Sequence, residues 1–378
     1  MKVVIAIDSL KGSMTSLEAG NAIKEGIEKV ANATVIVKPL ADGGEGTVEA
    51  LVNGMNGRYE SVTVTGPLES PIECQYGILE ESKTAIIEMS GAAGITLVPD
   101  FLKNPMNTTT YGVGEVIKDA ILKGCRNFIV GIGGSATNDG GTGMLKALGF
   151  GLLDAAGAPI ANGAKGLESL HSITTDHVLP ELKECNFKIA CDVTNPLCGD
   201  NGCSAIYGPQ KGATPEMITH MDQLLANYAL LTAKTFGKDT KDVPGTGAAG
   251  GMGFAFLSFL NGKLEPGIQI ILQEIKLEED IKDADIVITG EGRLDFQTAM
   301  GKAPIGVAKL AKKYNKKVFA FAGSVTKEAT ECNKEGIDAF FPILRRISTL
   351  EEAMNRTTAA ENLRDTAEQV FRLVSLYQ

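Results

Sequence analysis

The feature that most constrains the fold is an alternation of strand and helix patterns that occurs at both ends of the chain. Residues 3–7 and 34–37 are short apolar runs typical of buried strands, and apolar residues at helical spacing lie between them. The alternation returns late, with strand patterns at residues 285–289 and 317–322 around a helix pattern at residues 305–314. Strands that alternate with helices favour a parallel sheet. The sequence therefore predicts one Rossmann-like α/β domain formed by both termini.

Helix-start signals support this division into elements. Thr15 and Glu18 stand three residues apart before an apolar-periodic stretch, which is the pattern of a capping box. Thr214 precedes Pro215, a favoured pair at the N-cap and first position of a helix. Residues 359–376 have apolar side chains along one face and predict an amphipathic C-terminal helix.

The middle of the chain has a different pattern. Strand patterns at residues 61–65, 74–79 and 84–89 follow one another at short spacing, which indicates antiparallel pairing. A helix at residues 113–122 and a buried strand at residues 187–190 come later. These elements predict an inserted α/β domain with a mixed sheet.

The predicted domain boundaries follow from these patterns. We expect residues 1–57 and 265–378 to form the discontinuous Rossmann-like domain, with its parallel sheet. Residues 58–264 are expected to form the inserted domain. A cleft between two such domains would be the natural ligand site.

Composition excludes several classes of protein. The 378 residues carry a net charge of −10, which argues against a nucleic-acid partner. No apolar run has the length of a membrane span, and the N-terminus lacks the plan of a signal peptide, so we expect a cytoplasmic protein. The seven cysteines are expected to be reduced, and the three histidines form no ligand-like pair for zinc.

A glycine-rich segment at residues 131–143 is the strongest candidate for ligand binding. It follows the strand pattern at residues 128–130 and leads into a helix pattern at residues 144–148. Six glycines stand among short polar residues, so backbone N–H groups could approach an anion closely. A helix N-terminus adds oriented donors. The segment therefore predicts a phosphate site, and a flexible turn is the alternative.

Acidic residues also follow three predicted strands of the Rossmann-like domain. The segments are residues 8–13, with Asp8 and Lys11, residues 42–47, and residues 289–295. Ligands of open parallel sheets bind beyond the carboxyl ends of the strands, which favours a functional role. Ion pairs and helix caps are the structural alternatives.

Further polar loops lie in the inserted domain. They are residues 88–94, 108–115, 192–196 and 245–253, and each precedes a helix pattern or follows a strand pattern. Each of these signals is weak by itself.

Familiar nucleotide motifs are absent or incomplete. No Gly-Lys pair is followed by Ser or Thr, so there is no Walker A motif, and the protein-kinase motifs are missing. Gly131, Gly133 and Ala136 fit a loosened dinucleotide pattern, but Asp154 is an unconvincing ribose-binding acid. A nicotinamide-dependent dehydrogenase of a small hydroxy acid is therefore the alternative function.

Taken together, the motifs resemble the glycerate kinase type 1 family. The resemblance runs in order along nearly the whole chain, through residues 8–13, 41–47, 131–141, 192–197, 207–213 and 290–295. Leu10 stands where the family often has Phe, and Cys203 where Ala is expected. The resemblance implies two interrupted domains and transfer of the γ-phosphoryl group of ATP to D-glycerate with Mg²⁺. It leaves open the 2- or 3-hydroxyl as acceptor and the oligomeric state, a homo-oligomer being one alternative.

Roles for individual residues follow from the resemblance and from the chemistry of phosphoryl transfer, which is mostly positioning and charge neutralisation. Lys11 is expected on the transferring phosphate, and Arg293 on the glycerate carboxylate. Asp192 is the first candidate for the residue that orients or deprotonates the hydroxyl, and Asp8 the second. The remaining candidates are grouped by ligand: Gly133, Gly134, Ser135 and Asn138 for ATP phosphates, Asp42 and Asp139 for magnesium, and Ser90, Thr110, Glu291 and Asp295 for glycerate.

Overall fold

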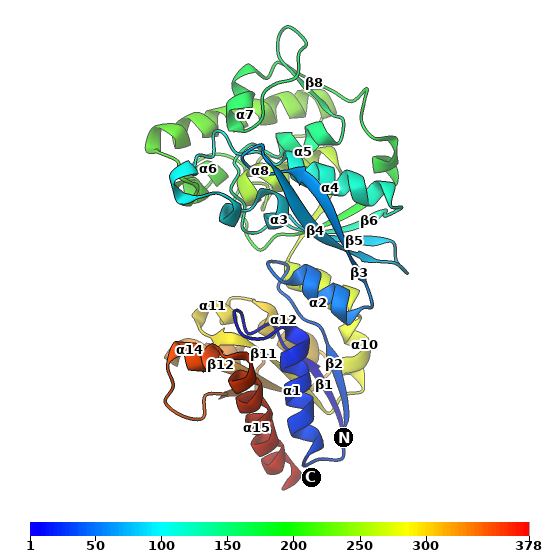
Figure 1. Cartoon of the computed structure of the whole chain (residues 1–378), viewed down its shortest axis with the longest axis vertical. Coiled ribbons are helices and arrows are strands. Elements are labelled where there is room, and N and C mark those ends of the chain that lie inside the picture. Colours follow the sequence, from blue (N-terminus) through cyan, green and yellow to red (C-terminus); the bar gives the residue numbers. More distant parts are fainter. Residues whose placement is uncertain (378) are drawn as a thin grey trace. The chain divides into compact units, whose positions relative to one another are not determined.

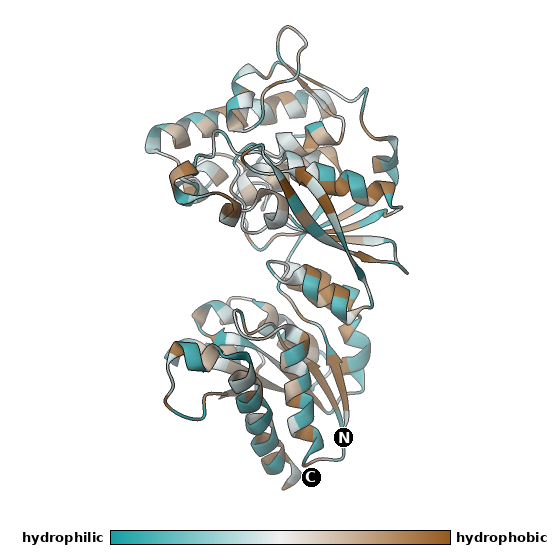
Figure 2. Cartoon of the chain, in the orientation of Figure 1, coloured by the Kyte–Doolittle hydropathy of each residue, from teal (hydrophilic) through white to brown (hydrophobic). Residues whose placement is uncertain are grey.

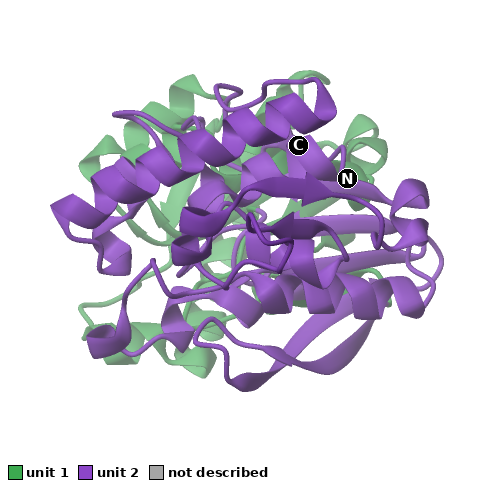
Figure 3. Ribbon diagram, turned by 90° about the horizontal axis from the view of Figure 1, so that it is seen from above, with its two compact units in different colours: residues 1–42, 49–56, 268–378 green, residues 43–48, 57–267 purple. Residues whose placement is uncertain are grey.

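The computed structural model describes residues 1–377 and divides the chain into two compact units (Figure 3). Unit 1 consists of Met1–Asp42, Glu49–Asn56 and Ile268–Gln378, of which the last residue lies outside the described range. Unit 2 consists of Gly43–Val48 and Gly57–Gly267. Each unit is described by itself, and the domain boundaries expected from the sequence stay a prediction.

Unit 1 is built on a five-stranded sheet in which every pair of neighbours is parallel (Figure 1). The strand order is β13-β12-β11-β1-β2. The bounds are β1(Lys2–Ala6), β2(Thr34–Lys38), β11(Ile286–Leu294), β12(Lys317–Val325) and β13(Ala339–Pro342). N-terminal β1 pairs directly with β11, which confirms a parallel sheet made from both ends of the chain.

The helices at the two ends of the chain also pack together in unit 1 (Figure 1). They are α1(Ser16–Glu28) and α15(Arg356–Ser375), and both bury apolar faces in one core cluster. The Thr15 side chain accepts a hydrogen bond from the Glu18 amide and the Glu18 side chain accepts one from the Thr15 amide, so the predicted capping box is confirmed. Helix α12(Ala303–Lys312) connects β11 to β12.

Unit 2 contains a six-stranded mixed sheet with the order β10-β9-β6-β5-β4-β3. The bounds are β3(Arg58–Thr65), β4(Pro71–Leu79), β5(Thr84–Glu88), β6(Asn127–Gly131), β9(Asn186–Ala190) and β10(Lys263–Glu265). The β3-β4-β5 part is antiparallel, and β5, β6, β9 and β10 are parallel, as expected for a mixed sheet. A small hairpin pairs β7(Gly151–Leu153) with β8(Ser172–Thr174).

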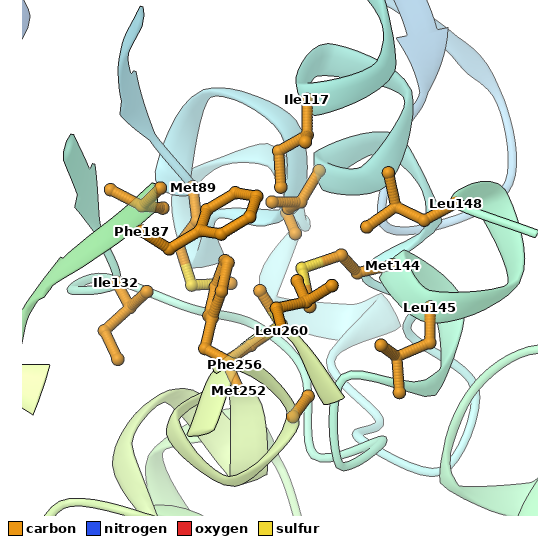
Figure 4. Close-up of a cluster of buried hydrophobic side chains, with 14 of the residues drawn as sticks. Met89, Ile117, Ile132, Met144, Leu145, Leu148, Phe187, Met252, Phe256 and Leu260 are labelled. Atoms are coloured by element: carbon orange, nitrogen blue, oxygen red, sulfur yellow. The ribbon is translucent and has the colours of Figure 1, made fainter. Parts of the chain in front are cut away.

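The main helices of unit 2 are α4(Tyr111–Leu122), α5(Thr142–Ala147), α7(Pro215–Phe236) and α8(Ala248–Phe259). Thr214 caps α7 by accepting a hydrogen bond from the Met217 amide, and Pro215 occupies the first turn, as predicted. Their apolar residues meet those of the sheet in one core cluster, which includes Met144 and in which the rings of Phe187 and Phe256 lie next to each other (Figure 4). The hydropathy colouring shows apolar residues on the strands of both sheets (Figure 2).

The remaining helices are short and mostly connect strands. Their bounds are α2(Thr47–Gly54), α3(Ser90–Ala93), α6(Cys203–Tyr207), α9(Gly267–Glu274), α10(Leu277–Lys282), α11(Phe296–Ala299), α13(Glu331–Lys334) and α14(Leu350–Met354). Among residues 1–377, no helix is long and apolar enough to cross a membrane. The seven cysteines form no disulfide. The cytoplasmic location and the oligomeric state stay predictions.

One expectation about local structure was wrong. The predicted strand was expected to end at residue 289, with an extended segment or a loop after it, but residues 290–294 continue strand β11, with Glu291 paired to Ala322 and Arg293 to Ser324 of β12. The cause is the length of β12, which extends to Val325 and provides partners for these residues. The side chains of Glu291 and Arg293 are therefore fixed on a sheet.

Candidate active site

A cavity of about 430 Å³ lies within unit 1, at the carboxyl ends of β1 and β11. At this point the strand order reverses, because β2 lies beyond β1 on one side and β12 lies beyond β11 on the other. Such a switch point is where ligands bind in open α/β sheets. The cavity is lined by six of the residues predicted from the sequence, namely Asp8, Lys11, Asp42, Glu291, Arg293 and Asp295.

Backbone and hydroxyl hydrogen bonds hold the loops that carry these residues. The amide of Asp8 donates to the Gly290 carbonyl at 2.9 Å, which ties the end of β1 to β11. The Ser16 hydroxyl donates to the Ile7 carbonyl at 2.7 Å and accepts from the Leu40 amide at 2.8 Å. One buried serine therefore joins the loops that carry Asp8 and Asp42.

The environment of Asp8 changes its acidity strongly. Burial raises the pKa of its carboxyl to about 7, and repulsion from Asp42 and Glu291 acts in the same direction. The Ser9 amide, which donates to Asp8 Oδ1 at 2.7 Å, and the Lys11 ammonium lower it. A carboxyl with a pKa near neutrality can accept or release a proton under physiological conditions.

The two other acidic residues on the β11 side have structural partners. Glu291 accepts a hydrogen bond from the Thr298 hydroxyl at 2.5 Å, and burial raises its pKa. Asp295 caps α11 by accepting from the amides of Gln297 and Thr298 at 2.9 and 3.2 Å. These bonds leave Glu291 and Asp295 less suited to a direct substrate contact than the sequence suggested.

Arg293 differs from its acidic neighbours in accessibility. Its side chain is 65% exposed, and its Nε lies 3.7 Å from Asp295 Oδ2. Because an exposed ion pair of this length is weak, the guanidinium can take a second anion as partner. A small carboxylate is the ligand that such a fork binds best.

In unit 2, Ser90, Gly133 and Asp192 each lie just past the carboxyl end of a strand. The strands are the parallel neighbours β5, β6 and β9, whose ends are in register through Gly131. These three predicted site residues therefore lie at one edge of the sheet. Asp192 is exposed and accepts a hydrogen bond from the Gly267 amide at 2.9 Å.

The glycine-rich loop presents its backbone at the same edge. Gly133 and Gly134 are exposed, and within residues 1–377 their amides donate no hydrogen bond. A side chain at Gly133 would meet open space, whereas Gly134 has a φ of 72° that favours glycine. Two unengaged amides on an accessible loop are suited to bind an anion.

Three residues of unit 2 that were predicted as ligand contacts have enclosed side chains, and their roles stay predictions. Asp139 is fully buried and accepts hydrogen bonds from the Thr110 amide and hydroxyl at 2.9 and 2.8 Å, and from the amides of Gly141 and Gly143. Both of its oxygens therefore already accept hydrogen bonds from the protein. Thr110 is buried against it, and the buried Asn138 amide donates to the Ser204 hydroxyl at 2.8 Å.

The sequence analysis missed the role of Lys211, which lies beneath the glycine-rich loop. Its ammonium is buried and donates to Ser135 Oγ at 2.8 Å and to the Thr137 carbonyl at 2.6 Å. Burial lowers its pKa to about 8. Ser135 is thus occupied by Lys211, and a cation lies behind the exposed glycines. The residue belongs to a segment that carried the family resemblance, but its burial cannot be detected in the sequence.

The pKa of Asp8 gives a prediction for stability. Because the folded-state pKa is raised above the ordinary value of 3.8, the folded protein loses stability as the pH rises from about 4 to about 7. Asp8→Asn removes the buried charge. Its melting temperature should equal that of the parent below pH 4 and exceed it above pH 7.

Thermal melts of both proteins from pH 4 to pH 8 measure this difference. Asp176→Asn, at an exposed aspartate, controls for the substitution itself. A parent protein that is more stable than Asp8→Asn at pH 8 would show that the ionised carboxylate is stabilised by its surroundings.

Comparison with known proteins agrees with this geometry. The sequence profile of the Glycerate kinase family matches residues 3–375. The chain is 49% identical to Glycerate 2-kinase of Escherichia coli (strain K12), over 93% of each chain. It is 46% identical to Glycerate kinase of Haemophilus influenzae, over 99% of each chain.

A solved structure supports the same relationship. A crystal structure from Salmonella typhimurium LT2, provisionally assigned as a glycerate kinase 2, superposes with a TM-score of 0.93 and 48% identity. The match covers 100% of this chain and 99% of the other. The chain belongs to the glycerate kinase family.

Proposed function

We propose that this protein transfers the γ-phosphoryl group of ATP to a hydroxyl group of D-glycerate, giving phosphoglycerate and ADP. The observation that carries the proposal is the unit 1 cavity, in which a carboxyl with a pKa near 7 lies close to a lysine and an accessible arginine. Membership of the glycerate kinase family favours this reaction over the dehydrogenase considered from the sequence.

Lys11 is assigned to the phosphoryl group that is transferred. It is exposed in the cavity, and it attracts the Asp8 carboxylate electrostatically. In phosphoryl transfer, negative charge on the phosphate oxygens must be offset while the hydroxyl oxygen bonds to phosphorus and the bond to the ADP oxygen breaks. A fixed ammonium provides this stabilisation without reorganisation.

Asp8 is our preferred proton acceptor, in place of Asp192. Both are candidates from the sequence, but Asp8 is buried beside Lys11 and has a pKa of about 7. A base works best when its pKa is near the working pH. Asp8 would take the proton of the glycerate hydroxyl as that oxygen bonds to phosphorus. Asp192 remains a candidate for orienting a substrate group.

Arg293 is assigned to the carboxylate of glycerate. Strand β11 fixes its backbone, and its guanidinium is accessible in the same cavity as Lys11. Two parallel N–H···O contacts would set the orientation of the short acid and so select which hydroxyl reaches the phosphate.

In unit 2, considered by itself, the loop at Gly133 and Gly134 is a candidate for binding phosphate oxygens of ATP. Its unengaged amides are the donors, and buried Lys211 adds a positive charge behind them. Ser90, which follows the neighbouring strand β5, remains a candidate for a polar contact at this edge.

Magnesium fits the residues of the unit 1 cavity. Asp42 lines the cavity and supplies the oxygen atoms that magnesium prefers, and a divalent cation there would relieve the repulsion between Asp42 and Asp8. Among residues 1–377, no group of three acidic, histidine or cysteine side chains could hold a metal. Because magnesium often binds through one or two carboxylates together with phosphates, Asp42 with the phosphate oxygens of ATP is a sufficient set, which leaves Asp8 as the proton acceptor. The ion would offset charge on the phosphate groups.

The product identifies the function directly. The Escherichia coli relative is named as a 2-kinase, so we expect 2-phosphoglycerate from ATP, magnesium and D-glycerate. Phosphorus NMR of the reaction mixture distinguishes it from 3-phosphoglycerate. NADH-linked turnover of a hydroxy acid, with no phosphoglycerate formed, would overturn the proposed function.

Lys11→Met tests the charge on the transferring group. The substitution keeps a long apolar stem and removes the ammonium, so kcat should fall by about 100-fold or more because transition-state charge is no longer offset. The melting temperature should change little, since the side chain is exposed. Lys24→Met, at a lysine on the outer part of α1, is the matched control. Unchanged kcat at saturating substrates would remove Lys11 from the reaction.

Gly133→Ala tests the backbone of the phosphate loop. The added methyl group meets open space and the φ is not positive, so the fold should be retained. The methyl group would nevertheless stand where the ligand approaches, and the KM for ATP should rise by about tenfold, which corresponds to roughly 1.4 kcal/mol. Steady-state kinetics at fixed glycerate measure this change, and an unaltered KM for ATP with full stability would count against the loop.

A further inference from the structure

The unit 1 cavity has an apolar wall that the reaction with glycerate does not explain. The wall comes from the chain after β13 and from α14, through Leu344, Leu350 and Met354. These side chains are 41%, 75% and 36% exposed, so they are not buried in the hydrophobic core. Large apolar side chains that stay exposed around a cavity indicate a ligand with an apolar face.

The cavity is also lined by charged side chains. It carries the cations Lys11 and Arg293 and the acidic residues Asp8 and Asp42. Glycerate is a three-carbon acid with two hydroxyl groups, and it would be bound by these charged side chains alone. A volume of about 430 Å³ is also several times larger than such a ligand requires.

A nucleotide matches both the apolar wall and the charged lining of the cavity. Its base is a flat, largely apolar ring, and its phosphates carry the charge that Lys11 can offset. We propose that the wall formed by Leu344, Leu350 and Met354 receives the purine base of ATP, with the phosphate chain directed toward Lys11. This inference rests on the proposed use of ATP as phosphoryl donor.

In this proposal, α14 contacts the base of the nucleotide and does not contact its phosphate chain. Leu350 begins α14 and Met354 ends it, one turn apart on the same face. Thr349 fixes the start of this short helix through a capping box with Glu352. The base would therefore bind to a preformed surface.

Leu350→Ser is the decisive variant, because Leu350 is exposed and its removal should not disturb the core. Ile347→Ser is the matched control. Ile347 lies in the same segment, is fully exposed and does not line the cavity. Leu344→Ser is a second wall variant that keeps the test open if Leu350→Ser is unstable.

Calorimetry should measure binding of two probes, a non-hydrolysable ATP analogue and inorganic tripolyphosphate, each with magnesium. Leu350→Ser should weaken binding of the analogue by about tenfold and leave tripolyphosphate binding unchanged, because only the analogue has a base. Ile347→Ser should bind both probes as the parent does. The KM for glycerate should be unaffected in all variants.

Other outcomes overturn the assignment. Analogue binding that is unchanged in both wall variants would move the base elsewhere. Equal weakening of both probes would show that the wall supports the phosphate site, and a raised KM for glycerate alone would assign the wall to the acceptor. The proposed function is judged separately, since a parent protein that makes no phosphoglycerate would refute it whatever the wall binds.

Discussion

The pairing of β1 with β11 is the interaction on which the candidate active site depends. Val3 lies opposite Ile286, so two segments separated by most of the chain form the middle of one parallel sheet. The bond from the Asp8 amide to the Gly290 carbonyl extends this pairing to the carboxyl edge. This pairing holds the loop that carries Lys11 next to the strand that carries Arg293. The contact between α1 and α15 adds apolar burial behind the sheet and stabilises the same long-range pairing.

The cavity also illustrates a conflict between stability and chemistry. Burial of Asp8 near Asp42 and Glu291 is unfavourable for the ionised carboxylate, and the fold accommodates it by keeping the proton until about pH 7. Strained electrostatics of this kind persist only when the surrounding structure is stable enough to enforce them. Here the enforcing elements are the central strands and the buried Ser16, which are among the best-packed parts of unit 1. The unfavourable free energy of burying the ionised Asp8 therefore arises at the candidate active site, where a carboxyl that exchanges its proton near pH 7 is useful.

Local signals in the sequence predicted the elements and the general position of the site. The capping box at Thr15 and the Thr214-Pro215 pair depend on neighbours in the chain, and the rule that polar residues after parallel strands share an edge depends only on topology. What the sequence could not show depends on tertiary contacts. Asp139 has the appearance of a ligand in sequence, but four donors from two separate segments enclose it. Nothing in the sequence around Lys211 shows that it is buried, which follows from its contacts with Ser135 and Thr137 of the glycine-rich loop.

The chain is acidic, and its two units offer different kinds of group for binding an anion. In unit 1 the local balance is set by Lys11 and Arg293 against carboxyls, of which Asp8 ionises only near pH 7. In unit 2 the donors are uncharged amides, and the cation Lys211 near the same loop is buried. A buried cation interacts more strongly at short range than an exposed one, because little water screens it. The net charge of −10 is consequently a property of the outer surface and says little about the potential at either carboxyl edge.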